Sequence, residues 1–595
     1  METKTRFKKR DILRHFLSAG INVSPKALGI LASKPLSNQD LEELILKISY
    51  LPDFKLHLTE SILKQTKFLN GAPSIPENTT VETSNENYPD QTDLEEEFPE
   101  YSSDTSSNSE VEDKDSNNEI SNATELAENI IDKESIEPKP QYPSEEDIER
   151  ELKISNPSRS SGGMSRFKPL AKEYAEQIEI RKDPNTNLYT SGSIDDFIAQ
   201  FRDRYVRLSE ILLQNPEVKN VIPINEAKSF HSSGNVNVIG MVTDKKPTRG
   251  GNAIKFSLDD QTEEIDVIVR NDERNSTTYR SMNHLIKDEV VYVSGFLKVD
   301  MSYGSRVLFA NKIVWPDIPM GYKSHIPSCP VSFALLSDLH IGSDNFLEKV
   351  FSRFTRYLNG EIGTSRDQEE AGKIKYVIVC GDLVDGIGIY RDQINELEIT
   401  DIYKQYEKAA ELFAQIPDYV KIIYIPGNHE PVRKAIPHPP VPSKYSKPFL
   451  DLGVTSLGDP SLVELHGIQF LLYHGDGIID MNNNIPGLLS NKPADTMREM
   501  LRCRHLSPTF GKEHTEKAPT AIDWLVVDQI PHVFHTGHMH INDLGHYRNV
   551  LLVNSGCFQD QTKFMKSLGI TPTPGKVPII SEKYGKLDTI TLTLM

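Results

Sequence analysis

From about residue 331 to the C-terminus, one short pattern recurs five times along the sequence. An apolar run ends, and residues of the kinds that bind metal ions follow at once. In order, VSFALL precedes SDLHIGS, YVIVC precedes GDLVDG, VKIIYIP precedes GNHE, IQFLLY precedes HGDG, and PHVF precedes HTGHMH. Apolar runs of this length that end at turn residues predict buried β-strands. Because loops held by a rigid sheet commonly carry functional sites, we predict a sheet-based domain whose strand ends share one site.

These loops offer carboxylate, imidazole and amide side chains and no thiolate. Asp338 and His340 are spaced i, i+2, and so are His538 and His540. In an extended segment this spacing directs both side chains to the same side. Mixed nitrogen and oxygen donors suit Mn, Fe or Zn, and so many ligands suit two ions that share a bridging carboxylate. The candidate metal-site residues are Asp338, His340, Asp382, Asp385, Asn428, His429, His474, His538 and His540.

Each motif is weak by itself, because a lone histidine at a strand end is more often structural than a ligand. A run of such motifs, each after a predicted strand, is much harder to obtain by chance, and we therefore predict a metal site. Two other residues are open to either interpretation. Arg433 suits a phosphate contact as well as a solvated surface position, and His505 suits the wall of the cleft as well as a structural role.

Before this block, the sequence predicts a helix and then a small β-barrel. The helical stretch is SIDDFIAQFRDRYVRLSEILLQ, and the strand-like runs are VNVIGMVTD, AIKFSLDD, EIDVIVR, EVVYVSGFLKV and RVLFANKIVWP. A helical segment, STTYRSMNHLIKD, lies between the third and fourth runs. Five strands with a helix after the third are the order of an oligonucleotide/oligosaccharide-binding (OB) barrel. Nucleic-acid binding and protein docking are both compatible with such a barrel.

The N-terminal part of the chain divides by composition. Residues 1–70 place apolar residues such as Ile12 and Phe16 at helical spacing, which predicts a small helical module for protein interaction. Residues 71–165 are acidic, rich in Ser and Asn, and poor in aliphatic residues. Such a segment cannot bury enough apolar surface to offset its chain entropy, so we predict a disordered linker.

The overall composition narrows the class of protein. The formal net charge is -20, so the chain is not a globally basic nucleic-acid binder, although an acidic linker can mask a basic face. The four cysteines form no CxxC pair, which argues against a disulfide framework and a zinc knuckle. No stretch approaches the roughly 20 apolar residues that a membrane helix needs. We expect a soluble cytoplasmic protein with no membrane partner.

The order D-x-H, G-D-x-x-D, G-N-H, H-G, G-H-x-H resembles that of the calcineurin-like metallophosphoesterase superfamily. More narrowly, SDLHIGS, GDLVDGIGIY, YIPGNHEPVR, MREMLRCRHLSPTFG, FHTGHMHIND and GITPTPGKVPII are similar to stretches in the small subunits of archaeal family D DNA polymerases, or DNA polymerase II small subunits. The similarity covers about 200 to 595. Arg391 stands where that family suggests proline, and Asp476 lies near His474, but neither departure removes a ligand.

The resemblance implies a multidomain α+β fold. An N-terminal helical module (1–70) and a disordered acidic linker (71–165) would precede a helical lead-in with an OB-fold β-barrel (166–325). A calcineurin-like αββα metallophosphoesterase β-sandwich (326–595) would follow and carry the metal site.

The resemblance also implies two divalent ions, with Mn as the expected metal and Mg, Fe or Zn as alternatives. One ion would be held by Asp338, His340, Asp382 and His540. The other would be held by Asp382, Asn428, His474 and His538, with Asp382 bridging.

Three further residues receive roles from the same resemblance. His429 would not bind metal but would face the scissile phosphate as general acid or transition-state stabiliser, and a histidine can fill either role. Asp385 matches a position that supports its loop. His535 is not used by the superfamily pattern, so it is interpreted as structural or as a support for the ligands.

The implied function is that of a 3′-to-5′ exonuclease that proofreads for a replicative polymerase and also acts as a scaffold for its large catalytic subunit. Its DNA partner would be a single-stranded or mismatched primer terminus, and the N-terminal module could bind a sliding clamp or primase. The sequence shows no cluster of three acidic residues in a recognisable polymerase active-site motif, so polymerase activity would belong to the complex. Two alternatives stay open: a mainly structural B-subunit, whose eukaryotic relatives have lost metal ligands, and a phosphoprotein or cyclic-nucleotide phosphatase.

Overall fold

The computed structural model of the chain divides into two compact units, Met1–Gly162 and Gly163–Met595. It describes residues 167–595, except Asn187, Tyr303, Lys512, Glu513 and Leu568, together with residues 12, 16, 22–23, 25–33, 41, 44 and 57–58 of the first unit.

The first unit contains one described helix, α2 (Pro25–Ala32), and one parallel strand pair, β1 (Asn22–Val23) and β2 (His57–Leu58). Ile12 and Phe16 are buried in helical segments. The predicted acidic linker and most of the predicted helical module lie outside the described residues, so both stay predictions.

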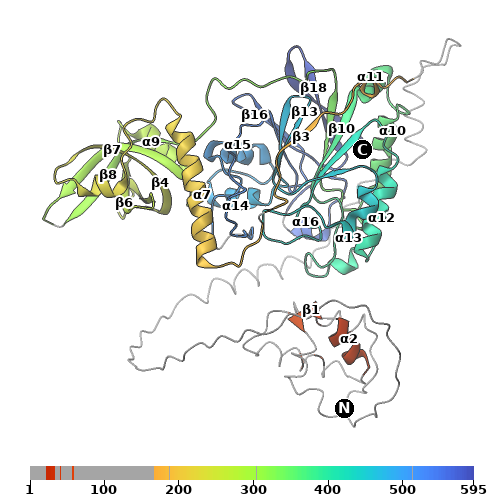
Figure 1. The fold of residues 1–595 in the computed structure, drawn as a ribbon, viewed down its shortest axis with the longest axis horizontal. Helices are drawn as coiled ribbons and strands as arrows, with labels where there is room; N and C mark the ends of the chain where they lie inside the picture. Colours follow the sequence, from red (N-terminus) through yellow and green to blue (C-terminus); the bar gives the residue numbers. More distant parts are fainter. Residues whose placement is uncertain are drawn as a thin grey trace, which may run out of the picture. The chain divides into compact units, whose positions relative to one another are not determined.

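The second unit begins with a segment of helices and one strand, here called the lead-in, and a closed five-stranded barrel follows it (Figure 1). The lead-in contains η1 (Leu170–Glu173), β3 (Ile178–Lys182), α7 (Ile194–Leu213) and α8 (Ile224–Ser229). The barrel strands are β4 (Gly234–Pro247), β5 (Ala253–Asp259), β6 (Glu264–Arg270), β7 (Val290–Asp300) and β8 (Ser305–Val314), with α9 (Ser276–Ser281) and η2 (Met282–His284) between β6 and β7.

The barrel closes in the order β4-β5-β6-β8-β7, with β6 and β8 parallel and the other pairs antiparallel. The period-2 pattern explains how it forms. On β6, Ile265, Val267 and Val269 are buried and the residues between them are not, so one face of the strand fills the barrel. The predicted OB-fold barrel is therefore confirmed.

Two six-stranded sheets pack face to face in the rest of the unit. The first has the order β12-β11-β10-β9-β18-β19 and the second β16-β17-β15-β14-β13-β3. The strands of the first are β9 (Ser332–Leu336), β10 (Ile374–Cys380), β11 (Lys421–Ile425), β12 (Thr455–Ser456), β18 (Lys576–Lys583) and β19 (Lys586–Thr593). The second adds β13 (Ser461–Leu465), β14 (Ile468–Leu472), β15 (Val533–Thr536), β16 (Asp543–Tyr547) and β17 (Val550–Asn554) to β3.

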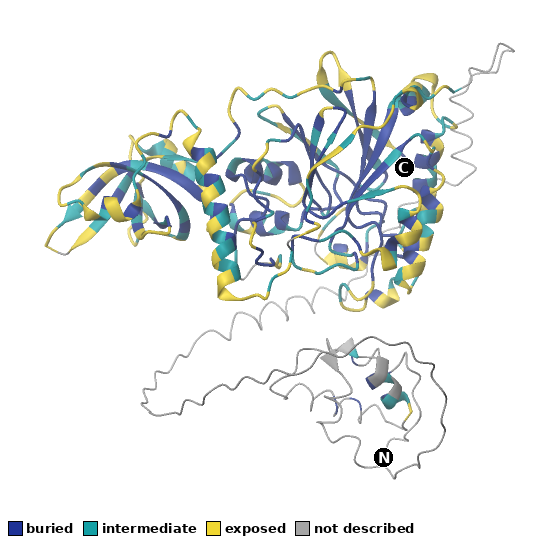
Figure 2. Cartoon of the chain, in the orientation of Figure 1, coloured by how far each residue is buried: buried dark blue, intermediate teal, exposed yellow. Residues whose placement is uncertain are grey.

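Helices cover both outer faces of this sandwich, as Figure 1 shows. One set packs on the first sheet: α10 (Glu348–Leu358), α11 (Ser365–Lys373), α12 (Ile402–Phe413) and α13 (Ser443–Leu450). The other face carries α14 (Gly477–Asn484) and α15 (Pro493–Cys503), and the shorter η3 (Gln393–Asn395) and α16 (Lys563–Ser567) lie in loops. Phe333, Ile378 and Phe470 belong to the core between the sheets, and Figure 2 shows these strands largely buried. The layers are therefore helix, sheet, sheet, helix.

The predicted boundary between the lead-in and the sandwich is wrong in one respect. β3 lies before the barrel in the sequence, yet it pairs with β13 as the edge strand of the second sheet. Its sequence, IEIRK, is short, and three of its five residues are charged. It therefore lacks the apolar run by which the other strands of the sandwich are predicted. The barrel is therefore inserted between β3 and the remaining strands of the sandwich.

The parallel strands bring the predicted site residues to one end of the sandwich. β9, β10 and β11 are mutually parallel in the first sheet, and β14, β15 and β17 are parallel in the second. The five ligand-bearing loops follow β9, β10, β11, β14 and β15. Among the residues that the structure describes, no helix is long and apolar enough to cross a membrane.

A buried ion pair joins the lead-in helix to the barrel and the sandwich. Arg204 on α7 donates from Nε to Asp523 Oδ2 over 2.7 Å, and both side chains are buried. The same guanidinium donates to the carbonyl oxygens of Asp288 in the barrel (3.2 Å) and Pro508 in the sandwich (2.7 Å). His505 Nε2 lies 3.0 Å from Asp523 Oδ2, so this histidine has the structural role. One arginine therefore holds three segments of the chain together.

Removing this arginine should destabilise the whole unit. Arg204→Ala leaves Asp523 buried without its cation, and the loss of one partner of such a pair costs about 3–5 kcal/mol of unfolding free energy. Urea unfolding measures the change. The exposed Arg202 on the same helix is the matched control, and Arg202→Ala should change stability by less than about 0.5 kcal/mol. Equal effects of the two substitutions would contradict the role of the Arg204 pair.

Candidate metal centre

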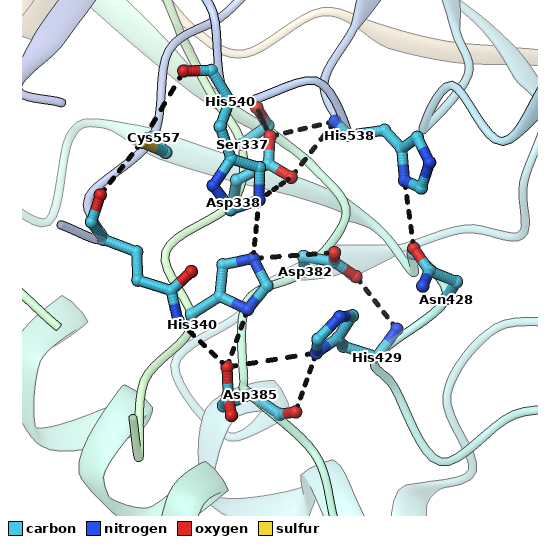
Figure 3. Close-up of polar contacts among 12 residues, drawn as sticks. Ser337, Asp338, His340, Asp382, Asp385, Asn428, His429, His538, His540 and Cys557 are labelled. Carbon is cyan, nitrogen blue, oxygen red and sulfur yellow. Dashed lines mark hydrogen bonds and ion pairs between the residues drawn. The ribbon is translucent and has the colours of Figure 1, made fainter. Parts of the chain in front are cut away.

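The structure brings the predicted ligands together at the carboxyl ends of the strands (Figure 3). Among the groups of oxygen and nitrogen atoms that lie within 4.8 Å of one another, two contain most of the predicted ligands. One contains Asp338, His340 and His540, and the other contains Asp382, His474 and His538. Asn428 joins the second group, because its Oδ1 lies 3.1 Å from both His474 Nε2 and His538 Nδ1.

The backbone at these residues is not extended, so the geometric reason given for the i, i+2 spacing is wrong. Five of the residues have left-handed φ angles: Asp338 (52°), His340 (54°), Asp382 (51°), His538 (66°) and His540 (58°). Such values are uncommon outside glycine, cost free energy, and cluster at functional sites. The side chains of each i, i+2 pair face the site because the chain curls around it, not because it runs straight.

In the first group, hydrogen bonding fixes which imidazole nitrogen carries a lone pair. His340 Nδ1 lies 2.9 Å from Asp385 Oδ1, and a carboxylate only accepts, so Nδ1–H donates. His340 Nε2 is then a bare acceptor in the neutral ring, and it faces His540 Nε2 at 3.1 Å. Asp338 Oδ1 lies 3.5 Å from His540 Nε2. Nitrogen and carboxylate lone pairs thus converge where a cation would satisfy them all.

The second group, which draws residues from loops of both sheets, follows the same logic. His474 Nδ1 donates to the carbonyl oxygen of Cys380 over 2.9 Å, which leaves Nε2 bare in the neutral ring. Asn428 Oδ1 and Asp382 Oδ2 lie 3.1 Å and 3.3 Å from that nitrogen, and neither oxygen can donate. His538 Nδ1 completes the group at 3.3 Å from His474 Nε2. The donor chemistry fits a borderline divalent ion such as Mn, Fe or Zn.

Asp382 links the two groups through one atom. Its Oδ2 lies 3.7 Å from His340 Nε2 and 3.3 Å from His474 Nε2. Its Oδ1 accepts a hydrogen bond from the backbone N–H of His429 over 3.0 Å, which fixes the carboxylate plane. A single oxygen is therefore placed to reach both groups, as a bridging ligand must.

Glycine at position 427 is required by close packing at the same point. A Cβ built there would lie 2.7 Å from His474 Nε2 and still closer to Asp382 Oδ1. Any side chain at Gly427 would displace these two groups. The glycine of GNH thus makes room for the site.

Asp385 and His429 lie beside the two groups. Asp385 accepts from His340 and also from the side-chain amides of Gln393 (2.8 Å) and Gln559 (3.2 Å), so it orients His340. His429 Nδ1 donates to the carbonyl oxygen of Asp385 over 2.8 Å. This bond leaves the other nitrogen of His429, Nε2, free of that contact.

Glu430 organises the centre, although the sequence motifs did not single it out. Its buried carboxylate accepts from the backbone N–H groups of Asp382 (3.2 Å), Leu383 (2.7 Å) and Gly427 (2.7 Å), and from Tyr424 Oη (2.8 Å). It therefore ties the loop after β10 to the loop after β11. The signal is present as the last letter of GNHE, but a motif that is read only for metal ligands leaves it out.

The electrostatics of the centre favour positive charge. Burial opposes protonation of His340, but its hydrogen bond to Asp385 and the charges of Asp382 and Asp338 raise its pKa to about 9. Burial also opposes protonation of His474, and Asp382 still raises the pKa of that ring well above its usual value. Both shifts favour protonation of these rings beside the carboxylates. Cations would take the place of these protons.

The remaining predicted residues lie outside the two groups. Arg433 donates to the carbonyl oxygens of Pro437 (2.9 and 2.7 Å) and Leu188 (2.7 Å), so a phosphate contact would have to share these donors. His535 is fully buried on β15, where Nε2 lies 2.8 Å from Ser555 Oγ.

His535 should make the fold sensitive to acid. Burial lowers the pKa of His535 to about 3, whereas an unfolded histidine titrates near 6.5. The unfolded state therefore binds more protons as pH falls from about 6.5 to 3, and unfolding free energy drops by about 1.4 kcal/mol per pH unit for this side chain. His535→Asn should have a shallower slope of stability between pH 6 and pH 4 in urea unfolding. The exposed His546 on β16 is the control, and His546→Asn should keep the wild-type slope. Identical slopes in all three proteins would overturn this role.

Comparison with known proteins places these features in a family. Residues 333–542 match the family model of the B-subunits of DNA polymerases alpha and epsilon, and residues 236–314 match the model of the OB-fold nucleic acid binding domain. Among solved structures, an asparaginyl-tRNA synthetase from Pyrococcus horikoshii aligns with 16% of this chain and 21% of its own, at 20% identity and a TM-score of 0.14, which is too low to indicate a shared architecture.

Curated relatives match over about two thirds to three quarters of this chain. The DNA polymerase II small subunit of Methanothermobacter thermautotrophicus is 39% identical over 437 residues, which cover 73% of this chain and 87% of the relative. The corresponding protein of Pyrococcus horikoshii is 37% identical over 461 residues, covering 75% and 70%, and that of Archaeoglobus fulgidus is 38% identical over 402 residues, covering 68% and 78%. The chain therefore belongs to the family of DNA polymerase II small subunits, the small subunits of archaeal family D DNA polymerases.

Proposed function

We propose that the chain is a metal-dependent 3′-to-5′ exonuclease that proofreads within a family D replicative polymerase. The observation that carries this proposal is the pair of acceptor groups that share Asp382 Oδ2. Asp338, His340 and His540 would hold one divalent ion, and Asn428, His474 and His538 the other, with Asp382 between them. Mn is the expected metal, with Mg, Fe or Zn as alternatives.

The fold supports the same assignment. A calcineurin-like metallophosphoesterase is a four-layered αββα sandwich with its ions at the strand ends, and the helix, sheet, sheet, helix order of this unit is consistent with it. Every side chain that the resemblance assigns to the two ions is present in the loops at these strand ends. That completeness favours catalysis over a purely structural B-subunit.

Two bound ions would stabilise the charge that develops on the phosphate and lower the pKa of an attacking water. The protein's own contribution is to hold donors and proton carriers in place. His429 has Nδ1 fixed on the Asp385 carbonyl, which aims Nε2 away from that loop. Burial lowers the pKa of His429, and a nearby phosphate would favour the protonated ring again. Protonated Nε2 can then donate to the leaving 3′-oxygen or to a phosphate oxygen.

The partners follow from the family. The large catalytic subunit of the polymerase would dock on this chain, and polymerase activity would belong to that complex. The substrate would be a DNA primer terminus, single-stranded or mismatched, and the barrel could bind either DNA or protein. The N-terminal module could bind a sliding clamp or primase, and the complex would act in the cytoplasm.

Nuclease activity is the first test. The full chain, alone and with its large subunit, should shorten single-stranded and mismatched 3′ ends when Mn²⁺ is present. Asp382→Ala should lower the rate by at least about 10³-fold, because it removes the shared ligand. No cleavage by the fully metal-loaded complex would leave the scaffold role as the better proposal. Hydrolysis of phosphopeptides or cyclic nucleotides in place of DNA would favour a phosphatase.

The amount of bound metal in histidine variants should distinguish metal ligands from adjacent histidines in the HTGHMH motif. His538→Ala and His540→Ala should each lose bound metal and abolish cleavage, because each removes a nitrogen from a different group. His535→Asn should keep the wild-type metal content, because Nε2 of His535 contacts Ser555. Equilibrium dialysis with Mn²⁺ followed by elemental analysis gives the content. Equal loss of metal in all three variants would contradict this division.

A further inference from the structure

We propose that His438, Asp459 and Asp476 form an additional divalent-cation site that positions the His474 loop. None of the three belongs to the two groups described above. One nitrogen and two carboxylate oxygens from these residues lie within 4.8 Å of one another. The site has ligands of its own, while its positioning role rests on the proposed function of His474 as a metal ligand.

The three candidate ligand atoms are buried and unsatisfied. His438 Nδ1, Asp459 Oδ2 and Asp476 Oδ2 have no hydrogen-bond partner among the residues that the structure describes. His438 and Asp459 are completely buried, and their nearest approach, Nδ1 to Oδ2, is 3.9 Å, too long for a hydrogen bond. Buried polar atoms in native proteins almost always have a partner, so three such atoms that face one another require an explanation.

The hydrogen bond of His438 shows which of its ring nitrogens lacks a proton. Nε2 lies 3.1 Å from the carbonyl oxygen of Lys434, and a carbonyl only accepts, so Nε2–H donates. Nδ1 of the neutral ring then presents a lone pair to two carboxylate oxygens. When both carboxyl groups are ionised, three acceptors converge without a donor among them, and a cation would satisfy all three at once. One imidazole and two carboxylates suit Zn²⁺ or Mn²⁺ better than the all-oxygen preference of Ca²⁺ or Mg²⁺.

Rigid backbone holds two of the ligands in register. His438 and Asp459 form a bridge in which His438 N donates to Asp459 O (2.8 Å) and Asp459 N donates to His438 O (2.9 Å). Asp476 lies immediately before α14, and its carbonyl oxygen accepts from Thr515 Oγ1 over 2.8 Å. The three side chains are therefore placed by backbone contacts that do not depend on an ion.

The location gives the site its role. Asp459 Oδ1 accepts from the backbone N–H of His474 over 2.9 Å, while Oδ2 of the same carboxylate belongs to the proposed site. Asp476 follows His474 by two residues. An ion held by Asp459 and Asp476 would restrain the backbone of the loop that carries His474. The three residues are thus positioning residues for a metal ligand.

Metal stoichiometry tests the site directly. The full chain, freed of metal and then titrated separately with Zn²⁺ and Mn²⁺, should bind three equivalents of at least one of them. His438→Gln and Asp476→Asn should each bind one equivalent less. His466→Gln is the matched control, because His466 is buried but contacts Cys329, and it should bind as many as wild type. Unchanged binding in both His438→Gln and Asp476→Asn would overturn the proposal.

A crystallographic measurement decides the matter even if the variants fail to fold. Crystals of the wild-type chain soaked in Zn²⁺ or Mn²⁺ and measured at the absorption edge of that metal should show an anomalous peak among His438, Asp459 and Asp476. Peaks only at the Asp338 and His474 groups would mean that a shared proton or a water, and not a metal ion, satisfies the three atoms. A peak at the proposed site without peaks at the other two would sink the two-ion proposal and leave this one standing.

Discussion

The centre of this protein depends on the hydrogen bond made by the far nitrogen of each key imidazole. His340 uses Nδ1 on Asp385, and His474 uses Nδ1 on the carbonyl of Cys380. Each bond orients its ring and, in the neutral form of that ring, leaves Nε2 with a lone pair directed into the site. Without these bonds the rings could turn or change tautomer, and the donors would not converge on Asp382. The same device fixes His429, whose Nδ1 is held by the carbonyl of Asp385.

Those hydrogen bonds are possible because the surrounding loops are held in uncommon conformations. Five of the predicted ligands have left-handed backbone angles, and Gly427 admits no side chain. The carboxylate of Glu430 holds the loop after β10 to the loop after β11. The buried strands before each loop form a rigid framework that holds these loop conformations. The stability of the sandwich core thus supports conformations that would be unfavourable in a free peptide.

The barrel and the sandwich are connected by more than chain continuity. Arg204 reaches Asp523 and two carbonyls from different segments, and Arg502 stacks over the ring of Trp315 at 4.0 Å. Barrel residues such as Val293 and sandwich residues such as Leu471 belong to one continuous apolar cluster. A chain connected in this way presents the barrel at a fixed position relative to the candidate metal centre.

The sequence by itself determined the barrel, the buried strands of the sandwich and the identity of the clustered side chains. Period-2 alternation and apolar runs are local signals, and motifs at strand ends can be read without knowing which strands are neighbours. It did not determine that β3 crosses to the edge of the second sheet, since pairing joins residues far apart in the chain. It also suggested the wrong reason for the i, i+2 pairs, because the left-handed backbone there is imposed by surrounding contacts.

Only the tertiary structure decided the roles of the supporting residues. Asp459 and His438 carry no distinctive local pattern, and Glu430 ends a motif that points only to metal ligands. The roles of all three arise from the backbone N–H groups and carbonyl oxygens that they meet in the folded chain. Hydrogen-bond direction depends on partners brought together from different loops. The sequence could therefore name the donors of the centre, while the fold decided which lone pairs face inward and which side chains hold them there.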